Sequence, residues 1–351
     1  MSAVICASNV LCAGGRGTEQ VWATVRSGMA CIGNSNVCDQ NFDSIHMGLV
    51  PEKELEPLPS SLASSALPSG AKRLLRLAGP TLAHLSAAAG TGPLTVFLGL
   101  PMPSDSLAAP WMDDFLMCLN QFEGVKIAAA GSRVFPFGRA AALVAMEAAL
   151  DRLREDPLAT VIVGGVDSFL DMRRIADLDA ERRILGPRVM DGFIPGEGAA
   201  FLALKADEPG TSATPTPALI VGAASSDDAG HRYGSSPNLG VGLADAIEGL
   251  RTKLPPDTRP IATTFAGING ESFDSKLWGV ARLRHGDLFA SNMVLQHPVD
   301  CFGDTGAAAG AILAALAGHA LSNGERDGSA LVWAASDHTT RSCALLSLKE
   351  N

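Results

Sequence analysis

The stretch DGFIPGEGAAFLAL, residues 191–204, joins a glycine-rich turn to a continuous apolar run. The run at 199–204 is typical of a strand that is covered on both faces of a sheet. The spacing Gly196-x-Gly198 lacks the further residues of a phosphate-binding loop, so we interpret it as close packing at a turn. We expect Glu197 to accept backbone N–H bonds in that turn. The stretch therefore predicts a core strand entered through a tight turn.

Similar apolar runs alternate with helical stretches upstream of this strand. The further strands that we expect there are residues 3–8, 94–100, 125–129 and 160–164. The expected helices are residues 20–27, 71–88, 111–121 and 137–153. This alternation predicts an α/β fold.

A connection rich in Pro, Thr and Ser, ADEPGTSATPTP at residues 206–217, interrupts the alternation, which then restarts. Later strands are expected at 218–223, 261–265, 289–295, 330–334 and 343–348, and later helices at 239–253, 275–284 and 305–317. The sequence therefore predicts an N-terminal half over residues 1–205, a linker at 206–217 and a C-terminal half over residues 218–351.

Composition excludes several classes of protein. The chain has 351 residues, of which 47% are hydrophobic and 18% charged, so it can bury a large core and is not expected to be disordered. Its formal net charge of −10 disfavours a nucleic-acid partner, because binding the phosphate backbone needs a basic field. No apolar run is long enough, without a charge or a breaker, to predict a membrane span.

Seven cysteines are scattered along the chain without any CxxC spacing. An odd number of dispersed cysteines favours reduced thiols in a cytoplasmic protein over a disulfide framework or a metal site. The apolar N-terminus lacks a basic region ahead of it, so we interpret it as a buried strand and not as a signal peptide. We expect neither a metal nor a cofactor, and a cytoplasmic location.

Three segments carry a family resemblance: DGFIPGEGAAFLAL, VIVGGVDS at 161–168 and EQVWATVRSG at 19–28. Together they resemble the beta-ketoacyl synthases of the thiolase superfamily. The resemblance implies a thiolase-like fold, in which two βαβαβαββ halves form a five-layer α-β-α-β-α arrangement. It also implies a dimer paired through an edge strand of the first half, which we place near residues 125–129.

The reactive positions of the family are altered in this sequence. The family's nucleophilic cysteine lies at the end of a strand just before a helix, and matching Gly131-Ser132 to its Gly-Ser places Ala130 there. The His-Gly-Thr motif falls on GINGES and places Asn269 at the first histidine, whereas FGDTGAAAGA places Asp304 at the second. The gating loop falls on residues 337–340 and includes His338. The resemblance thus implies a pocket without its thiol and imidazoles.

Two other side chains are fallback nucleophiles. Ser132 follows Ala130 closely and is interpreted as a cap of helix amides, with catalysis as the alternative. Cys301 precedes the Asp304 motif and is interpreted as a small buried thiol. We interpret the lone His338 as a structural residue that makes hydrogen bonds.

Two functional hypotheses follow from the joint loss of these groups. The first is a non-condensing scaffold or adaptor, since condensation needs the thiol and the oxyanion-holding groups together, and Asp304 adds a negative charge. NGESFDSKLWG at 269–279 also resembles short ketosynthase-like proteins encoded beside type VI secretion effectors, which implies an effector-loading role.

The second hypothesis is an acyl-binding protein or an acyltransferase of the 3-oxoacyl-carrier-protein synthase family. A chain-length-factor-like subunit, paired with an active ketosynthase, is one form of it. The partners implied are therefore a second copy or a related subunit, together with a secretion effector or an acyl carrier protein.

Overall fold

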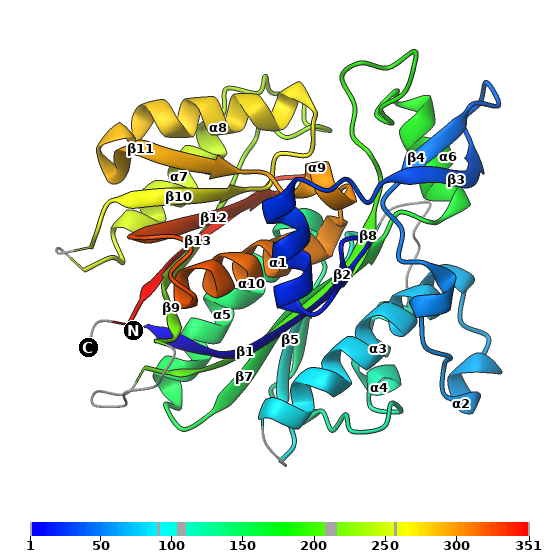
Figure 1. Cartoon of the computed structure of the whole chain (residues 1–351), viewed down its shortest axis with the longest axis horizontal. Helices are drawn as coiled ribbons and strands as arrows, with labels where there is room; N and C mark the ends of the chain where they lie inside the picture. The colour runs from blue at the N-terminus through cyan, green and yellow to red at the C-terminus, as the bar shows by residue number, and fades with distance from the viewer. Residues whose placement is uncertain (1, 90–91, 104–109, 208–215, 256–257, 350–351) are drawn as a thin grey trace.

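The computed structural model describes residues 2–89, 92–103, 110–207, 216–255 and 258–349. Its main sheet has the strand order β11-β10-β12-β13-β9-β1-β8-β7-β5-β6 (Figure 1). The strands of the first half are β1 (Ala3–Cys12), β5 (Thr95–Gly99), β6 (Arg133–Phe135), β7 (Thr160–Ser168) and β8 (Glu197–Ala206). Those of the second half are β9 (Ala218–Asp227), β10 (Ile261–Ala266), β11 (Phe289–Gln296), β12 (Ser329–Ala335) and β13 (Thr340–Leu348).

The same strand arrangement occurs twice. In each half the third, second and fourth strands run parallel, and the fifth and first strands follow in antiparallel pairing. The two five-stranded groups meet where β1 pairs with β9 through Ala3 with Ile220 and Val4 with Leu219. This short contact makes one hydrogen-bonded sheet of the two groups.

Helices lie between the two groups of strands and outside them (Figure 1). The inner layer holds α1 (Thr18–Ser27), α5 (Ala141–Glu155) and α10 (Ala309–Ser322), of which α5 and α10 contact strands of both halves. On the outside, α3 (Ser69–Ala89) covers β8, β1 and β7, and α7 (Val241–Arg251) covers β9 and β13 and packs against α8 (Ser272–Arg284). The predicted α/β, thiolase-like layering is confirmed.

Small residues allow the inner helices to pack closely. The sequence of α10, AGAILAALAGHALS, is apolar on all sides, which suits a helix buried between two sheets. A Cβ at Gly310 would lie 2.9 Å from the Leu143 side chain of α5, and one at Gly99 would lie 2.8 Å from the Ala142 nitrogen. Glycine is therefore needed where α5 approaches α10 and β5.

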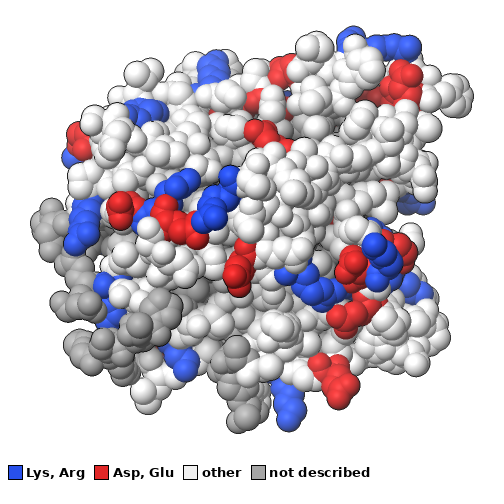
Figure 2. Space-filling view, in the orientation of Figure 1, with Lys and Arg blue, Asp and Glu red and all other residues white. Residues whose placement is uncertain are grey.

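The remaining elements surround the first half. They are β2 (Gly15–Arg16), the hairpin β3 (Gly33–Cys38) and β4 (Ser44–Met47), α2 (Ser60–Ala63), α4 (Phe115–Leu119), α6 (Met172–Ala180) and α9 (Val299–Phe302). Helix α6 was not predicted, although Asp171 caps it by accepting from the N–H groups of Arg173 and Arg174. Figure 2 shows basic and acidic side chains next to one another on one face.

Two predicted elements are wrong. Residues 125–129 form no strand, because only Ile127 makes a bridge, to Leu94, and the edge strand is β6. The helix predicted at 111–121 shortens to α4, preceded by a 3-10 turn at Pro110–Met112. The other predicted strands and helices coincide with observed elements within a few residues at each end.

The boundary between the two halves stays a prediction, since residues 208–215 of the predicted linker lie outside the described residues. Among the described residues, no helix has both the length and the apolar character of a membrane span.

Candidate functional site

Ala130 does not lie at the start of a buried helix, so the structural context predicted for it is wrong. Ala130 is exposed in a turn, and Gly131 continues that turn with a φ of 92°. The positive φ directs the chain into β6, and helix α5 begins only at Ala141. The Gly-Ser pair on which the match depended therefore has a different structural context from the one expected.

Arg139 occupies the junction between strand β6 and helix α5. The chain leaves β6 at Phe135, reverses at Gly138 with a φ of 58°, and forms a 3-10 turn over Gly138–Ala140 that leads into α5. The Arg139 side chain is buried, with about 7% of its surface exposed. This is the strand-to-helix position at which the family resemblance had placed a reactive side chain.

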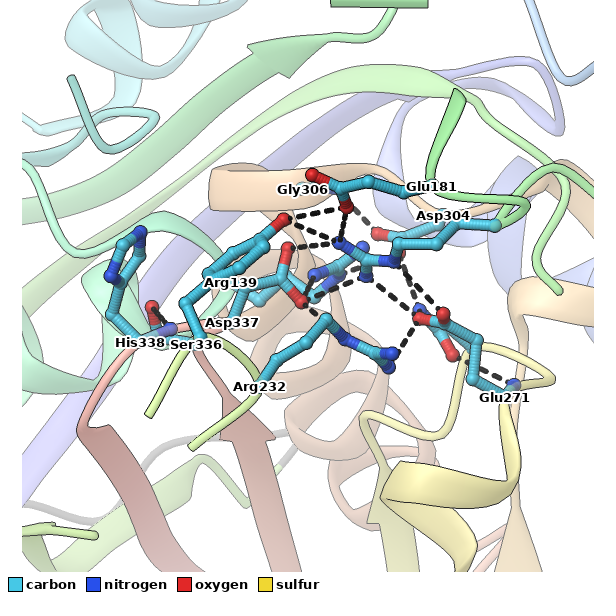
Figure 3. Close-up of polar contacts among 12 residues, drawn as sticks. Arg139, Glu181, Arg232, Glu271, Asp304, Gly306, Ser336, Asp337 and His338 are labelled. Carbon is cyan, nitrogen blue, oxygen red and sulfur yellow. Dashed lines mark hydrogen bonds and ion pairs between the residues drawn. The ribbon is translucent and has the colours of Figure 1, made fainter. Parts of the chain in front are cut away.

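Arg139, Asp304 and Asn269 converge although they come from three distant segments. Figure 3 shows Arg139 beside Asp304. Arg139 Nε donates to Asp304 Oδ2 at 2.6 Å, and Asn269 Nδ2 donates to the same oxygen at 3.1 Å. The other carboxylate oxygen of Asp304 accepts from the Gly306 N–H at 2.8 Å. The predicted positions Asn269 and Asp304 thus meet each other, and they meet Arg139 and not Ala130.

The backbone of Asp304 is fixed by the stretch with which the sequence analysis began. The Asp304 N–H donates to the Ile194 carbonyl oxygen, and the Gly196 N–H donates to the Asp304 carbonyl oxygen, each at 2.8 Å. A Cβ at Gly306, whose φ is 52°, would lie 1.9 Å from Asp167. The glycine turn of residues 191–198 therefore packs directly against the loop that carries Asp304.

Asp337, from the predicted gating loop, joins this cluster through its carboxylate. It lies 2.9 Å from Arg139 Nη1, and it accepts from both terminal nitrogens of Arg183 at 2.9 and 3.1 Å. Arg183 also forms a two-bond pair with Glu271 at 2.8 and 3.0 Å. Arg232 completes the network, 2.9 Å from Glu271.

The network is balanced in charge: three guanidinium groups, Arg139, Arg183 and Arg232, face the carboxylates of Asp304, Asp337 and Glu271. Beneath them, the guanidinium groups of Arg139 and Arg183 lie 5.0 and 5.4 Å from the centre of the Phe193 ring. We call these six charged residues together with Asn269 the arginine–carboxylate network.

Burial and neighbouring guanidinium groups shift the pKa of the carboxyl groups at this site in opposite directions. Burial would raise the pKa of Asp337, but Arg139 and Arg183 hold it well below its ordinary range. Asp274, a buried neighbour on α8, has a pKa raised from 3.8 to about 7 by burial, despite the opposing effect of Arg139. Glu271 and Asp337 raise the pKa of Asp274 further. Asp337 is therefore held as a carboxylate, whereas the protonated form of Asp274 is favoured.

Two cavities lie on either side of Arg139. The inner one measures about 30 Å³, and residues such as Ala266, Phe302 and Ile312 line it. The outer cleft measures about 540 Å³ and is lined by α6 residues, Tyr233 and His338. Arg139 lines both cavities, so its side chain stands between them.

The remaining predicted residues lie at the edge of this site or outside it. The His338 ring lies 5.2 Å from the Tyr233 ring and points away from the ion pairs (Figure 3). Ser132 Oγ accepts from the Val96 N–H at 3.0 Å and donates to the Ala128 carbonyl oxygen, so it braces a loop and caps no helix. Cys301 is buried, and burial raises the pKa of its thiol.

Arg139 was the residue that sequence reasoning missed. The sequence did point to it, because the predicted helix began at residue 137, which places Arg139 near the helix start. The match of two residues to Gly131-Ser132 was weaker evidence for the position of the reactive side chain. Glu197 accepts a backbone N–H bond, but from Val50 and not from the turn as predicted: its Oε1 accepts from the Val50 N–H at 2.8 Å, and Arg73 forms a two-bond ion pair with it. Glu197 is thus a structural carboxylate.

A model of the beta-ketoacyl synthase N-terminal domain matches residues 138–209, a range that begins beside Arg139. No curated protein sequence matches the chain. The fold resembles the module 6 ketosynthase of the bacillaene synthase from Bacillus subtilis 168, with a TM-score of 0.77, 13% identity, and coverage of 100% of this chain and 72% of that one.

Two ketosynthase complexes are similar over nearly their whole chains. One is a type II polyketide synthase acyl-carrier protein with its ketosynthase bound to the hexaketide (TM-score 0.75, 15% identity, 99% of each chain). The other is the ketosynthase ApeO with its chain length factor ApeC from Xenorhabdus doucetiae (TM-score 0.72, 17% identity, 99% of this chain and 98% of that one). The chain is therefore ketosynthase-like in fold, as the sequence resemblance implied.

Proposed function

We propose that the chain is a non-condensing ketosynthase-like scaffold or adaptor protein. The observation that carries the proposal is the ion pair of Arg139 with Asp304 at the strand-to-helix junction. A guanidinium group whose pKa is raised by Asp304 and Asp337, against the effect of burial, has no free electron pair with which to attack a thioester. No thiol or imidazole lines the inner cavity among the described residues.

Charge also opposes condensation at this site. An acyl-transfer intermediate needs donors directed at a developing oxyanion, each worth about 3 kcal/mol. Asp304 presents a carboxylate, and the side-chain donors nearest to it, Arg139 and Asn269, are already bonded to that carboxylate. The arginine–carboxylate network therefore serves structure at the position where the family resemblance implied chemistry.

The size of the inner cavity bears on the acyl-binding alternative. A cavity measured in this way needs about 10–15 Å³ to hold one water molecule, so a volume of about 30 Å³ is far too little for an acyl chain. An acyl chain would require displacement of Arg139 or of the apolar residues behind it. This favours the scaffold role over the acyl-binding role.

A chain-length-factor-like role remains the second candidate. It is favoured by the similarity, over 98–100% of the other chain, to chains solved as ketosynthase and chain length factor complexes. In that role the chain would pair with a catalytic subunit through the free edge of β6. A secretion effector or an acyl carrier protein as a further partner, and a cytoplasmic location, stay predictions.

The test is intact-mass analysis of the purified protein after incubation with acyl-carrier thioesters, with an active ketosynthase as positive control. We expect an adduct on the control and none on this chain. A stable acyl adduct on wild type, mapped to any residue, would refute the non-condensing proposal.

Size-exclusion chromatography of the chain mixed with a ketosynthase from the same genome separates the two candidates. Formation of a stoichiometric complex favours the chain-length-factor-like role. Elution of the chain as a homodimer, together with capture of a non-ketosynthase protein encoded by a neighbouring gene, favours the scaffold role.

A further inference from the structure

Three of the seven cysteines meet where the segment after α1 contacts α9. Cys12 ends β1, Cys31 lies between α1 and β3, and Cys301 lies in α9. Burial raises the pKa of both Cys12 and Cys301, and the neighbouring Cys31 raises each of them further. Sequence spacing gave no sign of this cluster, because the three positions are far apart in the chain.

The backbone places Cys31 and Cys301 within reach of each other. The Cys31 N–H donates to the Cys301 carbonyl oxygen at 2.6 Å. The bond lengths along the path Cα–N···O=C–Cα hold the two Cα atoms at most roughly 6.8 Å apart, and disulfides usually join Cα atoms roughly 4.4–6.8 Å apart. The Cys31 thiol now lies 3.9 Å from the Met29 carbonyl oxygen, so it has to leave that contact to reach Cys301.

The solvent exposure of the three cysteines indicates which thiol an oxidant reaches first. Cys31 is half-buried and therefore reachable from solvent, whereas Cys301 is 6% and Cys12 1% exposed. The pKa of Cys12 is raised to about 12, mainly by burial, which leaves it the least reactive of the three. Cys31 is thus the thiol that meets an oxidant first, and Cys301 is the partner that its backbone contacts.

We propose that Cys31 and Cys301 form a reversible disulfide when hydrogen peroxide reaches Cys31. The Cys31 thiolate attacks one peroxide oxygen, which gives the sulfenic acid and one water molecule. Cys301 Sγ then attacks Cys31 Sγ, the S–S bond forms, and the sulfenic hydroxyl leaves as water with the proton of Cys301. Peroxide accepts the two electrons that the two thiols lose.

The cross-link would tie the loop of the arginine–carboxylate network to the segment after α1. Cys301 lies three residues before Asp304, and the intervening Phe302 lines the inner cavity. Helix α9 is already tightly packed, since a Cβ at Gly48 would lie 1.8 Å from the Phe302 carbonyl oxygen. Cys31 therefore makes the movement, and α9 keeps its position. This inference is independent of the proposed function.

The test treats the full chain with hydrogen peroxide and measures intact mass and non-reducing peptide maps. Wild type is expected to lose two hydrogen atoms, about 2 Da, to show a Cys31–Cys301 linked peptide, and to return to its starting mass with a dithiol. Cys31→Ser abolishes the loss. Cys38→Ser, which removes an exposed thiol only seven residues away, leaves it unchanged.

Four outcomes overturn the proposal: no loss of mass, a link that maps to Cys12 or Cys38, a cross-linked dimer, or Cys31 oxidised to its sulfinic acid without a disulfide. Cys301→Ser is the second variant, with its thermal unfolding curve as the check on folding. A folded Cys301→Ser protein should stop at the sulfenic acid, which a dimedone-type reagent traps. A disulfide in that variant would also refute the assignment.

Discussion

Replacing Arg139 with methionine should destabilise the chain strongly. Methionine keeps most of the length of the side chain and removes its charge. Asp304, of whose side chain only 2% is exposed, then loses its bond to Nε at 2.6 Å, and Asp337 loses its contact with Nη1 at 2.9 Å. Removal of one partner from a buried ion pair costs about 3–5 kcal/mol, because the other charge stays buried.

The magnitude can be followed by urea unfolding. With a slope of about 3 kcal/mol per molar urea, a loss of about 4 kcal/mol lowers the midpoint by roughly 1.3 M. The measurement is circular dichroism at pH 7.5 for wild type, Arg139→Met and a matched control, Arg154→Met. Arg154 lies on α5, the helix that follows the turn of Arg139, but it pairs with Asp151 on the surface, with both side chains more than half exposed, so its loss should change the midpoint little.

The double variant Arg139→Met/Asp304→Asn makes the test decisive. Because the asparagine removes the carboxylate that Arg139→Met leaves unpaired, the double variant should be more stable than the single Arg139→Met variant. A midpoint for Arg139→Met equal to that of Arg154→Met, or a double variant less stable than the sum of the two single changes, would refute the reasoning.

Three further predictions concern pH, catalysis and assembly. The protonated form of Asp274 is favoured in the folded protein, so its stabilising effect is complete below pH 3.8 and is lost as the pH rises toward 7. The free energy of unfolding of wild type relative to Asp274→Asn should therefore fall by about 3 kcal/mol between pH 5 and pH 8. A constant difference in urea midpoints would contradict this. Neither Arg139→Cys nor Ala130→Cys should elongate an acyl-carrier thioester in a mass-spectrometric assay. In Arg139→Cys the Asp304 carboxylate faces the new thiol, and in Ala130→Cys the new thiol is exposed. Elongation by either variant would contradict the site assignment. We expect a dimer paired through β6 at micromolar concentration, and a monomer in sedimentation velocity would contradict it.

The sequence predicted the fold well because its signals were long and redundant. The apolar run in β8 and the apolar, alanine-rich sequence of α10 can be buried only between layers, so their place was fixed by composition. The strand predicted at 125–129 failed for the opposite reason. Its last two residues are alanines, which offer little apolar surface to bury, and the chain forms a turn there before β6.

Site positions were predicted where glycines constrain the backbone. Asn269 is followed by Gly270 with a φ of 113°, and Asp304 is preceded by Gly303 with a φ of 75°. Because glycine is favoured at such positions, these two segments could be aligned with the family's motifs in only a few ways. The match at Ala130 depended on two small residues that occur in many turns. The contact of Arg139 with Asp304 could not be predicted, because the two residues are 165 positions apart and no local pattern connects them.

On the proposal that the chain is non-condensing, the arginine–carboxylate network means that condensation would need several simultaneous changes. The resemblance implied a pocket that had lost its reactive groups, but the structure has that space filled by ion pairs. A single change of Arg139 to cysteine leaves Asp304 and Asp337 with fewer cationic partners, and a single change of Asp304 to histidine places a new imidazole against a buried guanidinium group. Each step alone loses stability by breaking a buried pair. Since neither step gains the full set of groups that must act together in condensation, we expect neither single variant to condense an acyl-carrier thioester.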